Sequence, residues 1–309
     1  MRRKLIKQGK NALTVTLPAK WIEENNLKAG DEVDIDGKSD LLEIKSGKIQ
    51  KEENLKAKIN AGNYFQFLNI ATCSLYRGGI DEIEINFSDK KANEIIHKQI
   101  EKQLIGFEVI SQSNEKTSVK SLTSISDDSF DDMLKRLFSI IISACENAYK
   151  GISEGNTLLL ENSYLIDRTI NKSSNFIARI LTKTERKKKQ SALFYYALIR
   201  QLEELGDHYR DLCLFYSKKY VKPRQEDIKF LKKTNELVEK TRELFYFFKE
   251  KESDLLLSEL KEMREEIKGS FTSRKTDLFL KYYLLIILET LKGIIVKVFD
   301  IKLNKDLDN

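Results

Sequence analysis

Apolar and polar residues alternate in the first part of the chain. The segments LTVTLP and EVDID, residues 13–18 and 32–36, each place their apolar side chains on one face, which is typical of half-buried strands. The proline of the first segment stands where a short helix can begin, and a turn is centred on Gly30. Residues 1–48 therefore predict a small β module with one short helix. A module this short buries too little apolar surface for a stable core, so we expect it to pair with a second copy of itself.

Helical and strand patterns follow each other in the next part of the chain, residues 51–124. NYFQFLNIATCSLY and SDKKANEIIHKQIEKQ carry apolar residues at helical spacing, with Ser88 as the expected N-cap of the second helix. IDEIEINF, FEVISQ and TSVKSLTSI favour strands. This part predicts a small α/β layer without catalytic features, in which His97 is expected to pack against its neighbours.

Helical periodicity continues to the end of the chain, over residues 127–309. The predicted helices form two sets separated near Pro223: about 129–150 (ended by Gly151), 157–181 and 190–219, then 224–251, 253–268 and 274–303. We therefore expect a pair of three-helix bundles, over residues 127–220 and 224–303. The apolar stretch YYLLIILETLKGIIVKVF is interrupted by charged residues, so we expect a buried helix and no membrane insertion.

Positive charge is concentrated at the start of the chain, although the net charge of the whole chain is only +6. Six cations precede the first acidic residue, Glu23: Arg2, Arg3, Lys4, Lys7, Lys10 and Lys20. Cations held on a fixed scaffold are what the recognition of phosphate requires, and pairing of the module would double their number. Charge alone leaves two interpretations open, a DNA-binding surface or strand edges that are kept soluble by lysine and arginine.

The first fifty residues resemble the AbrB/SpoVT swapped-hairpin family of DNA-binding proteins. The resemblance rests on a basic first strand, the T-V-T-L-P segment, and Gly9, Leu27, Gly30, Asp31 and Val33. In that family two chains interleave into a dimeric barrel that grips DNA, which implies this role for Arg2, Arg3, Lys7 and Lys10. Lysine stands here where many members carry arginine, and lysine makes a point-charge contact to phosphate. The resemblance therefore implies weak sequence selectivity from this segment.

Three carboxylates follow each other at intervals of four residues in ALFYYALIRQLEELGDHYRDLCLFY: Glu203, Asp207 and Asp211. This spacing stacks them on one helix face, roughly opposite the apolar stripe, where their charges repel each other. A hard or borderline cation would relieve the repulsion, and His208 lies beside them in sequence. The alternative is a solvated acidic face whose partners are Arg200 and Arg210.

The segment LEELGDHYRDL resembles the third-helix motif of PhoU, the phosphate uptake regulator. That family has two three-helix bundles that carry metal ions or clusters on Glu-x-x-x-Asp motifs, which implies divalent or iron- or zinc-type ions at Glu203 and Asp207. The corresponding helix of the second bundle, LETLKGIIVKV, offers Glu289 but has Gly293 where the aspartate belongs. The order of the parts is similar to archaeal-type PhoU-like proteins with an AbrB-like module in front.

The remaining features narrow the class of protein. The three cysteines, Cys73, Cys145 and Cys213, show no metal-ligand spacing and no signal peptide is recognisable, so we expect a cytoplasmic protein. The segment TERKKKQ, residues 184–190, is either a solvated loop or a contact to nucleic acid or an anionic membrane. Trp21 is expected in the core of the first module. With two histidines and no phosphate loop, nucleophile elbow or paired-histidine motif, we do not expect an enzyme.

The sequence thus predicts a multidomain α+β protein: a swapped-hairpin β-barrel module (1–48), an α/β middle layer (51–124) and an all-α pair of bundles (127–309). The expected function is that of a dimeric DNA-binding regulator of phosphate uptake. The alternative is an adaptor without DNA binding that contacts a phosphate transporter ATPase or a sensor kinase. A weaker option is metal storage or hydrolysis at the carboxylates of the third bundle helix.

Overall fold

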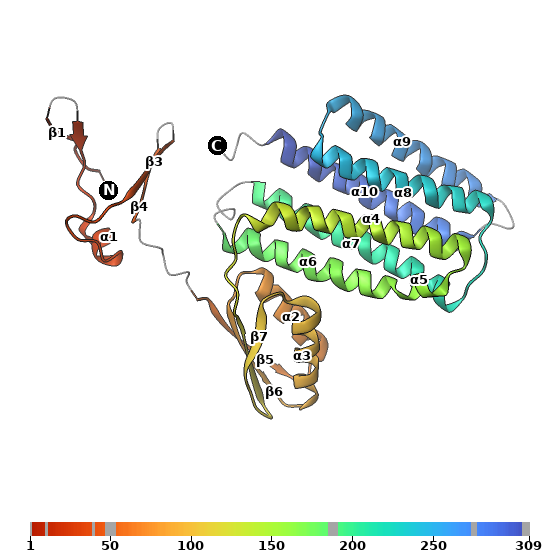
Figure 1. Cartoon of the computed structure of the whole chain (residues 1–309), viewed down its shortest axis with the longest axis horizontal. Helices are drawn as coiled ribbons and strands as arrows, with labels where there is room; N and C mark the ends of the chain where they lie inside the picture. The colour runs from red at the N-terminus through yellow and green to blue at the C-terminus, as the bar shows by residue number, and fades with distance from the viewer. Residues whose placement is uncertain are drawn as a thin grey trace. The chain divides into compact units, whose positions relative to one another are not determined.

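The computed structural model describes residues 2–9, 12–38, 41–46, 54–184, 191–272 and 277–304. The basic part of the TERKKKQ segment lies outside these ranges, so both interpretations of it stay predictions. The chain divides into two compact units, Met1–Asn54 and Leu55–Asn309. The mixture of short strands, a four-stranded sheet and long helices confirms the predicted α+β class (Figure 1).

The first unit consists of two hairpin-like strand pairs and one short helix. Its elements are β1 (Ile6–Gln8), β2 (Ala12–Thr14), α1 (Ala19–Glu24), β3 (Asp34–Lys38) and β4 (Leu41–Lys45). β1 pairs antiparallel with β2, and β3 pairs antiparallel with β4. Gly30 has a φ of +99°, a conformation that suits glycine and allows the predicted turn.

The first unit has no apolar core of its own among its described residues. Leu5, Ile6 and Leu13 are each more than half exposed in this single chain. Trp21 is only partly buried, so the prediction that it fills a core is wrong for one copy of the module. Two-stranded pairs are marginally stable without a covered apolar face.

The second unit begins with an α/β layer. Its elements are β5 (Lys56–Gly62), α2 (Phe65–Arg77), β6 (Glu82–Phe87), α3 (Lys91–Gln103), β7 (Phe107–Gln112) and β8 (Lys116–Ser121). The sheet has the order β5-β6-β8-β7, in which only the β5–β6 pair is parallel. One face of the sheet packs with α2 and α3 around Leu68, Ile83 and Ile96. The strand β5 was missed by the sequence analysis, because lysines and small residues hide its alternation.

Two local predictions in this layer are wrong. Helix α3 begins at Lys91 rather than directly after Ser88, and the carboxylate of Asp89 accepts the Lys91 N–H at 2.9 Å. His97 is exposed rather than packed, and its Nε2 lies 2.7 Å from Oε1 of Gln112 on β7.

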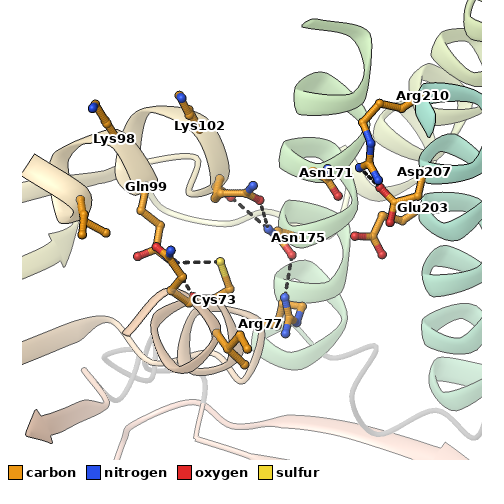
Figure 2. Close-up of a pocket in the computed structure, with 14 residues that line it drawn as sticks. Cys73, Arg77, Lys98, Gln99, Lys102, Asn171, Asn175, Glu203, Asp207 and Arg210 are labelled. Atoms are coloured by element: carbon orange, nitrogen blue, oxygen red, sulfur yellow. Dashed lines mark hydrogen bonds and ion pairs between the residues drawn. The ribbon is translucent and has the colours of Figure 1, made fainter. Parts of the chain in front are cut away.

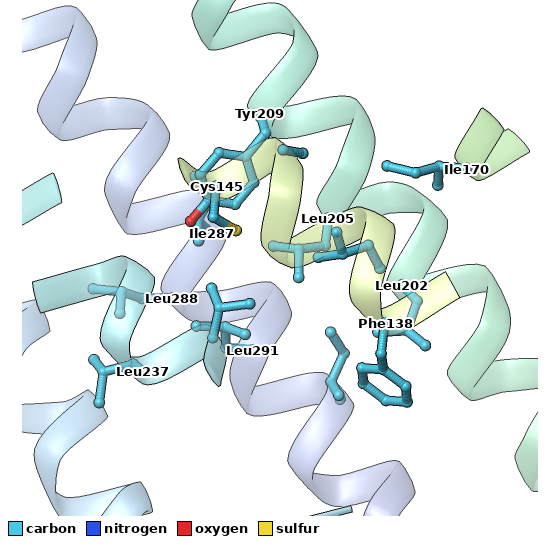
Figure 3. Close-up of a cluster of buried hydrophobic side chains, with 14 of the residues drawn as sticks. Phe138, Cys145, Ile170, Leu202, Leu205, Tyr209, Leu237, Ile287, Leu288 and Leu291 are labelled. Atoms are coloured by element: carbon cyan, nitrogen blue, oxygen red, sulfur yellow. The ribbon is translucent and has the colours of Figure 1, made fainter. Parts of the chain in front are cut away.

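The rest of the second unit is a layered bundle of helices with one continuous apolar core. The helices are α4 (Ser129–Glu154), α5 (Thr157–Glu161), α6 (Ser163–Lys183), α7 (Ser191–Lys218), α8 (Gln225–Tyr246), α9 (Glu250–Gly269) and α10 (Leu278–Leu303). Helix α7 packs against both α6 and α10, so the two predicted sets of three share a core. Figure 3 shows Leu202 and Leu205 of α7 in the same cluster as Leu288 and Leu291 of α10.

Several helix ends differ from the sequence prediction. Helix α8 ends at Tyr246 instead of residue 251, and α10 begins at Leu278 instead of residue 274. Helix α4 continues through Gly151 to Glu154 and ends at Gly155, whose φ is +72°. Gly151 does not end the helix, and its lack of a side chain is needed there because a Cβ would lie 2.7 Å from a methyl group of Leu160. The predicted second helix is divided into α5 and α6 at Asn162. In the part of the chain that the structure describes, no helix is long and apolar enough to cross a bilayer.

Candidate nucleic-acid interface and ligand cleft

The cations predicted to bind DNA lie on or beside the first elements of the first unit. Arg2, Arg3, Lys4 and Lys7 are exposed, and no carboxylate among the described residues lies within ion-pair distance of any of them. Lys20 is also exposed and lies 3.8 Å from Glu24, one turn further along α1. Lys10 lies outside the described residues.

The first hairpin combines cationic and apolar side chains. In the β1–β2 ladder Lys7 is directly opposite Leu13, and directly paired residues project from the same face. Leu13 is 63% exposed in the single chain. A partner that covered Leu13 would therefore fix the position of Lys7 as well.

The carboxylates of α7 are paired with arginines. Glu203 pairs with Arg200 of the same helix. Arg210 contacts three carboxylates: Asp207 and Asp211 of its own helix, the latter at 2.9 Å, and Asp167 of α6, also at 2.9 Å. The like-charge repulsion expected from spacing of four is thus relieved by guanidinium groups in this structure.

The surroundings of these carboxylates change their acidity. Burial raises the pKa of Glu203, although the nearby Arg200 opposes this effect. Burial is also the main reason why the pKa of Asp167 is raised to about 7, and the neighbouring Asp207 adds to the increase. The imidazole of His208 lies 4.0 Å from the carboxylate of Glu204, and burial lowers the pKa of His208.

The carboxylates of α7 belong to no metal-ligand set among the residues that the structure describes. Within the described ranges there is no group of three or more His, Cys, Asp or Glu side chains that could hold a metal ion. Glu289 of α10 pairs with Arg264 of α9, and a Cβ at Gly293 would collide with Gln201 of α7. The metal sites implied at Glu203 and Asp207, and more weakly at Asp211 and Glu289, therefore stay predictions.

A cleft of about 600 Å³ lies between the α/β layer and the bundle. Helices α2 and α3 form one wall, and α6 and α7 form the other. Figure 2 shows Glu203, Asp207 and Arg210 on the α7 side and Lys98, Lys102 and Gln99 on the α3 side. We call this feature the layer–bundle cleft.

Hydrogen bonds fix the floor of the layer–bundle cleft. Nη1 of Arg77 on α2 donates to Oδ1 of Asn175 on α6 at 2.9 Å. The amide of Asn175 in turn donates to Oε1 of Gln103 on α3 at 3.0 Å. The side chain of Asn175 therefore links both helices of the α/β layer to α6 (Figure 2).

The sequence analysis found the acidic side of this cleft but missed its basic side. The sequence does contain a signal for the lining residues, because they recur at a spacing of four on each helix: Asn69, Cys73 and Arg77; Lys98 and Lys102; Gln99 and Gln103; Asn171 and Asn175; Glu203 and Asp207. Spacing of four identifies one face of one helix but does not tell which faces meet.

Comparison with known proteins bears mainly on the first unit. Residues 6–48 match the family model of MazE antitoxins, described as antidote-toxin recognition MazE, bacterial antitoxin. The sequence analysis predicted an AbrB/SpoVT-like module here, and the match confirms an N-terminal module of the MazE/AbrB-like antitoxin type. Among solved structures, the chain is similar to PhoU from Pseudomonas aeruginosa, with 14% identity and a TM-score of 0.42, over 56% of this chain and 92% of that chain. No curated protein matches the chain.

Proposed function

We propose that this protein is a dimeric DNA-binding regulator of phosphate uptake. The observation that carries the proposal is the coincidence of two features in one short module. The segment that matches the MazE antitoxin family, residues 6–48, contains Lys7 and closely follows Arg2, Arg3 and Lys4. These four cations are exposed and have no carboxylate partner among the described residues. Such cations gain free energy from phosphates because neutralised phosphates release counterions.

The dimer is supported by the apolar surface of the first unit. Leu5, Ile6 and Leu13 are 65%, 56% and 63% exposed, and no apolar side chain is buried among the described residues of the first unit, whereas the second unit has two buried apolar clusters. A second copy that interleaved with these strands would cover them and bring two sets of cations together. The two sets could then contact successive phosphates of one duplex.

The helical bundle is proposed to receive the signal. This step rests on the resemblance of LEELGDHYRDL to the third-helix motif of PhoU, whose carboxylates are Glu203 and Asp207 in this chain. In this proposal a change of charge or occupancy beside α7 shifts an equilibrium between two states of the dimer, as regulation requires. A metal ion at Glu203 and Asp207 is one form that the signal could take.

DNA binding of the full chain tests the proposal. Purified protein is titrated into labelled duplex fragments recovered by co-purification from cells, and retention is followed by gel shift. We expect retention by the natural chain and its loss on reversal of three charges, R2E/R3E/K7E. The matched control reverses three exposed lysines of the second unit, K91E/K135E/K229E, and should retain binding.

The same experiment separates the adaptor hypothesis from the regulator hypothesis. If the natural chain fails to retain any duplex at low ionic strength, DNA binding is overturned. Equal retention by the natural chain and R2E/R3E/K7E would overturn the assignment of the cations. Capture of a phosphate transporter ATPase or a sensor kinase without DNA retention would support the adaptor.

A further inference from the structure

Two cations of the layer–bundle cleft have only neutral hydrogen-bond partners among the described residues. Arg77 donates to the side chains of Asn175 at 2.9 Å and Ser74 at 3.3 Å. Lys102 donates to the hydroxyl of Tyr164 at 3.1 Å. Neither cation has a described carboxylate within ion-pair distance. Both can therefore accept an anion without first giving up an ion pair.

The charge of the cleft as a whole also favours an anion. Four lining residues are cationic, Arg77, Lys98, Lys102 and Arg210, and two are acidic, Glu203 and Asp207, so the formal charge of the lining is +2. Both carboxylates already pair with arginines of α7. The remaining positive charge is therefore on the wall formed by α2 and α3. Arg77 and Lys102 have no described ion pair there, and Lys98 pairs with Glu94, which is exposed to solvent.

The cleft offers neutral polar groups as well as charge. Five carboxamides line it: Asn69, Gln99, Gln103, Asn171 and Asn175. The Gln99 side chain is nearly inaccessible, its residue being 5% exposed, and its Oε1 has no hydrogen-bond partner among the described residues. Carboxamides present a donor and an acceptor together, which complements the edge of a heterocyclic base. Ile70 and Ile95 add an apolar surface for the face of such a ring.

We propose that the layer–bundle cleft binds a nucleotide. The phosphate groups would lie against Arg77, Lys98 and Lys102, because guanidinium and ammonium groups are the usual phosphate partners. The base would lie among the carboxamides, against Ile70 and Ile95. A volume of about 600 Å³ is far larger than a single phosphate ion needs and falls within the range of small-molecule sites. The site does not depend on the proposed DNA binding.

The proposed ligand touches both the α/β layer and the bundle. Its phosphates would contact α2 and α3, while Asn171 on α6 would contact its base. A nucleotide that binds only while the α/β layer and the bundle are in contact would therefore stabilise that contact.

Calorimetric titration of the full chain tests this proposal. AMP, ADP and ATP are compared with adenosine and inorganic phosphate as separate arms. We expect measurable binding of at least one nucleotide, and binding at least about tenfold weaker for adenosine and for phosphate, because each lacks one half of the contacts. The double variant K98E/K102E should weaken nucleotide binding by about tenfold or more. The control variant K90E/K91E makes the same charge change at the start of α3, outside the cleft, and should bind like the natural chain.

Each result of the titration either supports or overturns the proposed nucleotide site. Lys102→Gln, which removes the charge and keeps most of the stem, serves as a second variant if K98E/K102E does not fold. Absence of nucleotide binding, or equal binding by Lys102→Gln and the natural chain, would overturn the site. Inorganic phosphate binding as tightly as every nucleotide would overturn the recognition of a base. Gel-shift results with R2E/R3E/K7E bear on DNA alone, so failure of one proposal is distinguishable from failure of the other.

Discussion

The guanidinium of Arg179 on α6 lies 2.6 Å from the carboxylate of Asp81, directly before β6. Both side chains are largely buried, at 1% and 12% exposure. Arg179 also donates to the carbonyl of Tyr76 at 2.9 Å, and its guanidinium lies over the rings of Tyr76 and Phe107. Asp81 accepts the N–H of Leu55, the first residue of the second unit, at 3.0 Å. This ion pair therefore attaches the α/β layer to the bundle.

Replacement of Arg179 by methionine should strongly destabilise the second unit. Loss of one partner of a buried ion pair leaves the other charge uncompensated, which costs about 3–5 kcal/mol. Lys183 still lies 2.8 Å from Asp81, so we expect the lower end of this range in urea denaturation. Arg168→Met is the control, because Arg168 pairs with the exposed Glu101 and its loss should cost less than about 1 kcal/mol. Equal losses in the two variants would contradict the role of Arg179.

Gly206→Ala should destabilise the contact between α6 and α7. A Cβ at this position would lie 2.7 Å from Cδ1 and 3.1 Å from Cγ2 of Ile170, which is buried. Overpacking costs about 1–3 kcal/mol, whereas alanine recovers about 1 kcal/mol of helix propensity. We expect a net loss of about 1 kcal/mol in the free energy of unfolding. Gly269→Ala, at a position with open space, should lose nothing, and a Gly206→Ala protein as stable as this control would contradict the close packing.

Leu13→Asp should dissociate the dimer. A charge placed in an interface that covers Leu13 would be costly to desolvate, whereas the same change on a free surface would be harmless. Sedimentation should give twice the chain mass of 36.0 kDa for the natural protein and a shift toward the single-chain mass for the variant. Leu255→Asp, at an exposed position of α9, should leave the mass unchanged. A natural protein that sediments as a single chain would exclude the proposed pairing.

The pH dependence of stability should change on replacement of Asp167 by asparagine. The pKa of Asp167 is raised from 3.8 to about 7 in the folded chain, so the protonated form is favoured by folding. The stabilisation linked to this proton is complete below the unfolded pKa of 3.8 and is lost as pH rises through about 7. The asparagine of the Asp167→Asn variant would stay neutral at every pH, so the variant should gain stability relative to the natural chain as pH rises from about 5 to about 8.

The size of this change has an upper bound. A pKa unit corresponds to about 1.4 kcal/mol, so a shift of this size gives at most about 4 kcal/mol. Chemical denaturation of both proteins at about pH 5 and about pH 8 measures the difference. A stability difference between them that does not vary with pH would show that Asp167 has an ordinary pKa.

The sequence predicted the helical bundle well because its signal is local. The apolar stripe of α7 recurs through Leu198, Leu202 and Leu205, and all three are buried. The spacing of the helical segments indicated the long helices. Errors were confined to helix ends, such as those of α4 and α8, and to the break at Asn162. Periodicity also indicated most of the α/β layer.

The candidate sites could be predicted only in part, because they depend on which faces meet. Spacing of four placed Glu203 and Asp207 on one face, but nothing in that spacing indicates that Arg77 and Lys102 approach from another part of the chain. The pairing of Arg210 with a carboxylate of α6 likewise depends on the packing of α6 against α7. The cations of the first module were predictable because they lie close together in sequence.

The salt dependence of duplex binding tests the central claim most directly. For the natural chain, the logarithm of the binding constant should fall linearly and steeply with the logarithm of salt concentration. R2E/R3E/K7E removes three cations per chain and six per dimer, so the slope should become shallower by up to about 5. An identical slope for the natural chain and this variant, or the absence of duplex binding at low salt, would contradict the account.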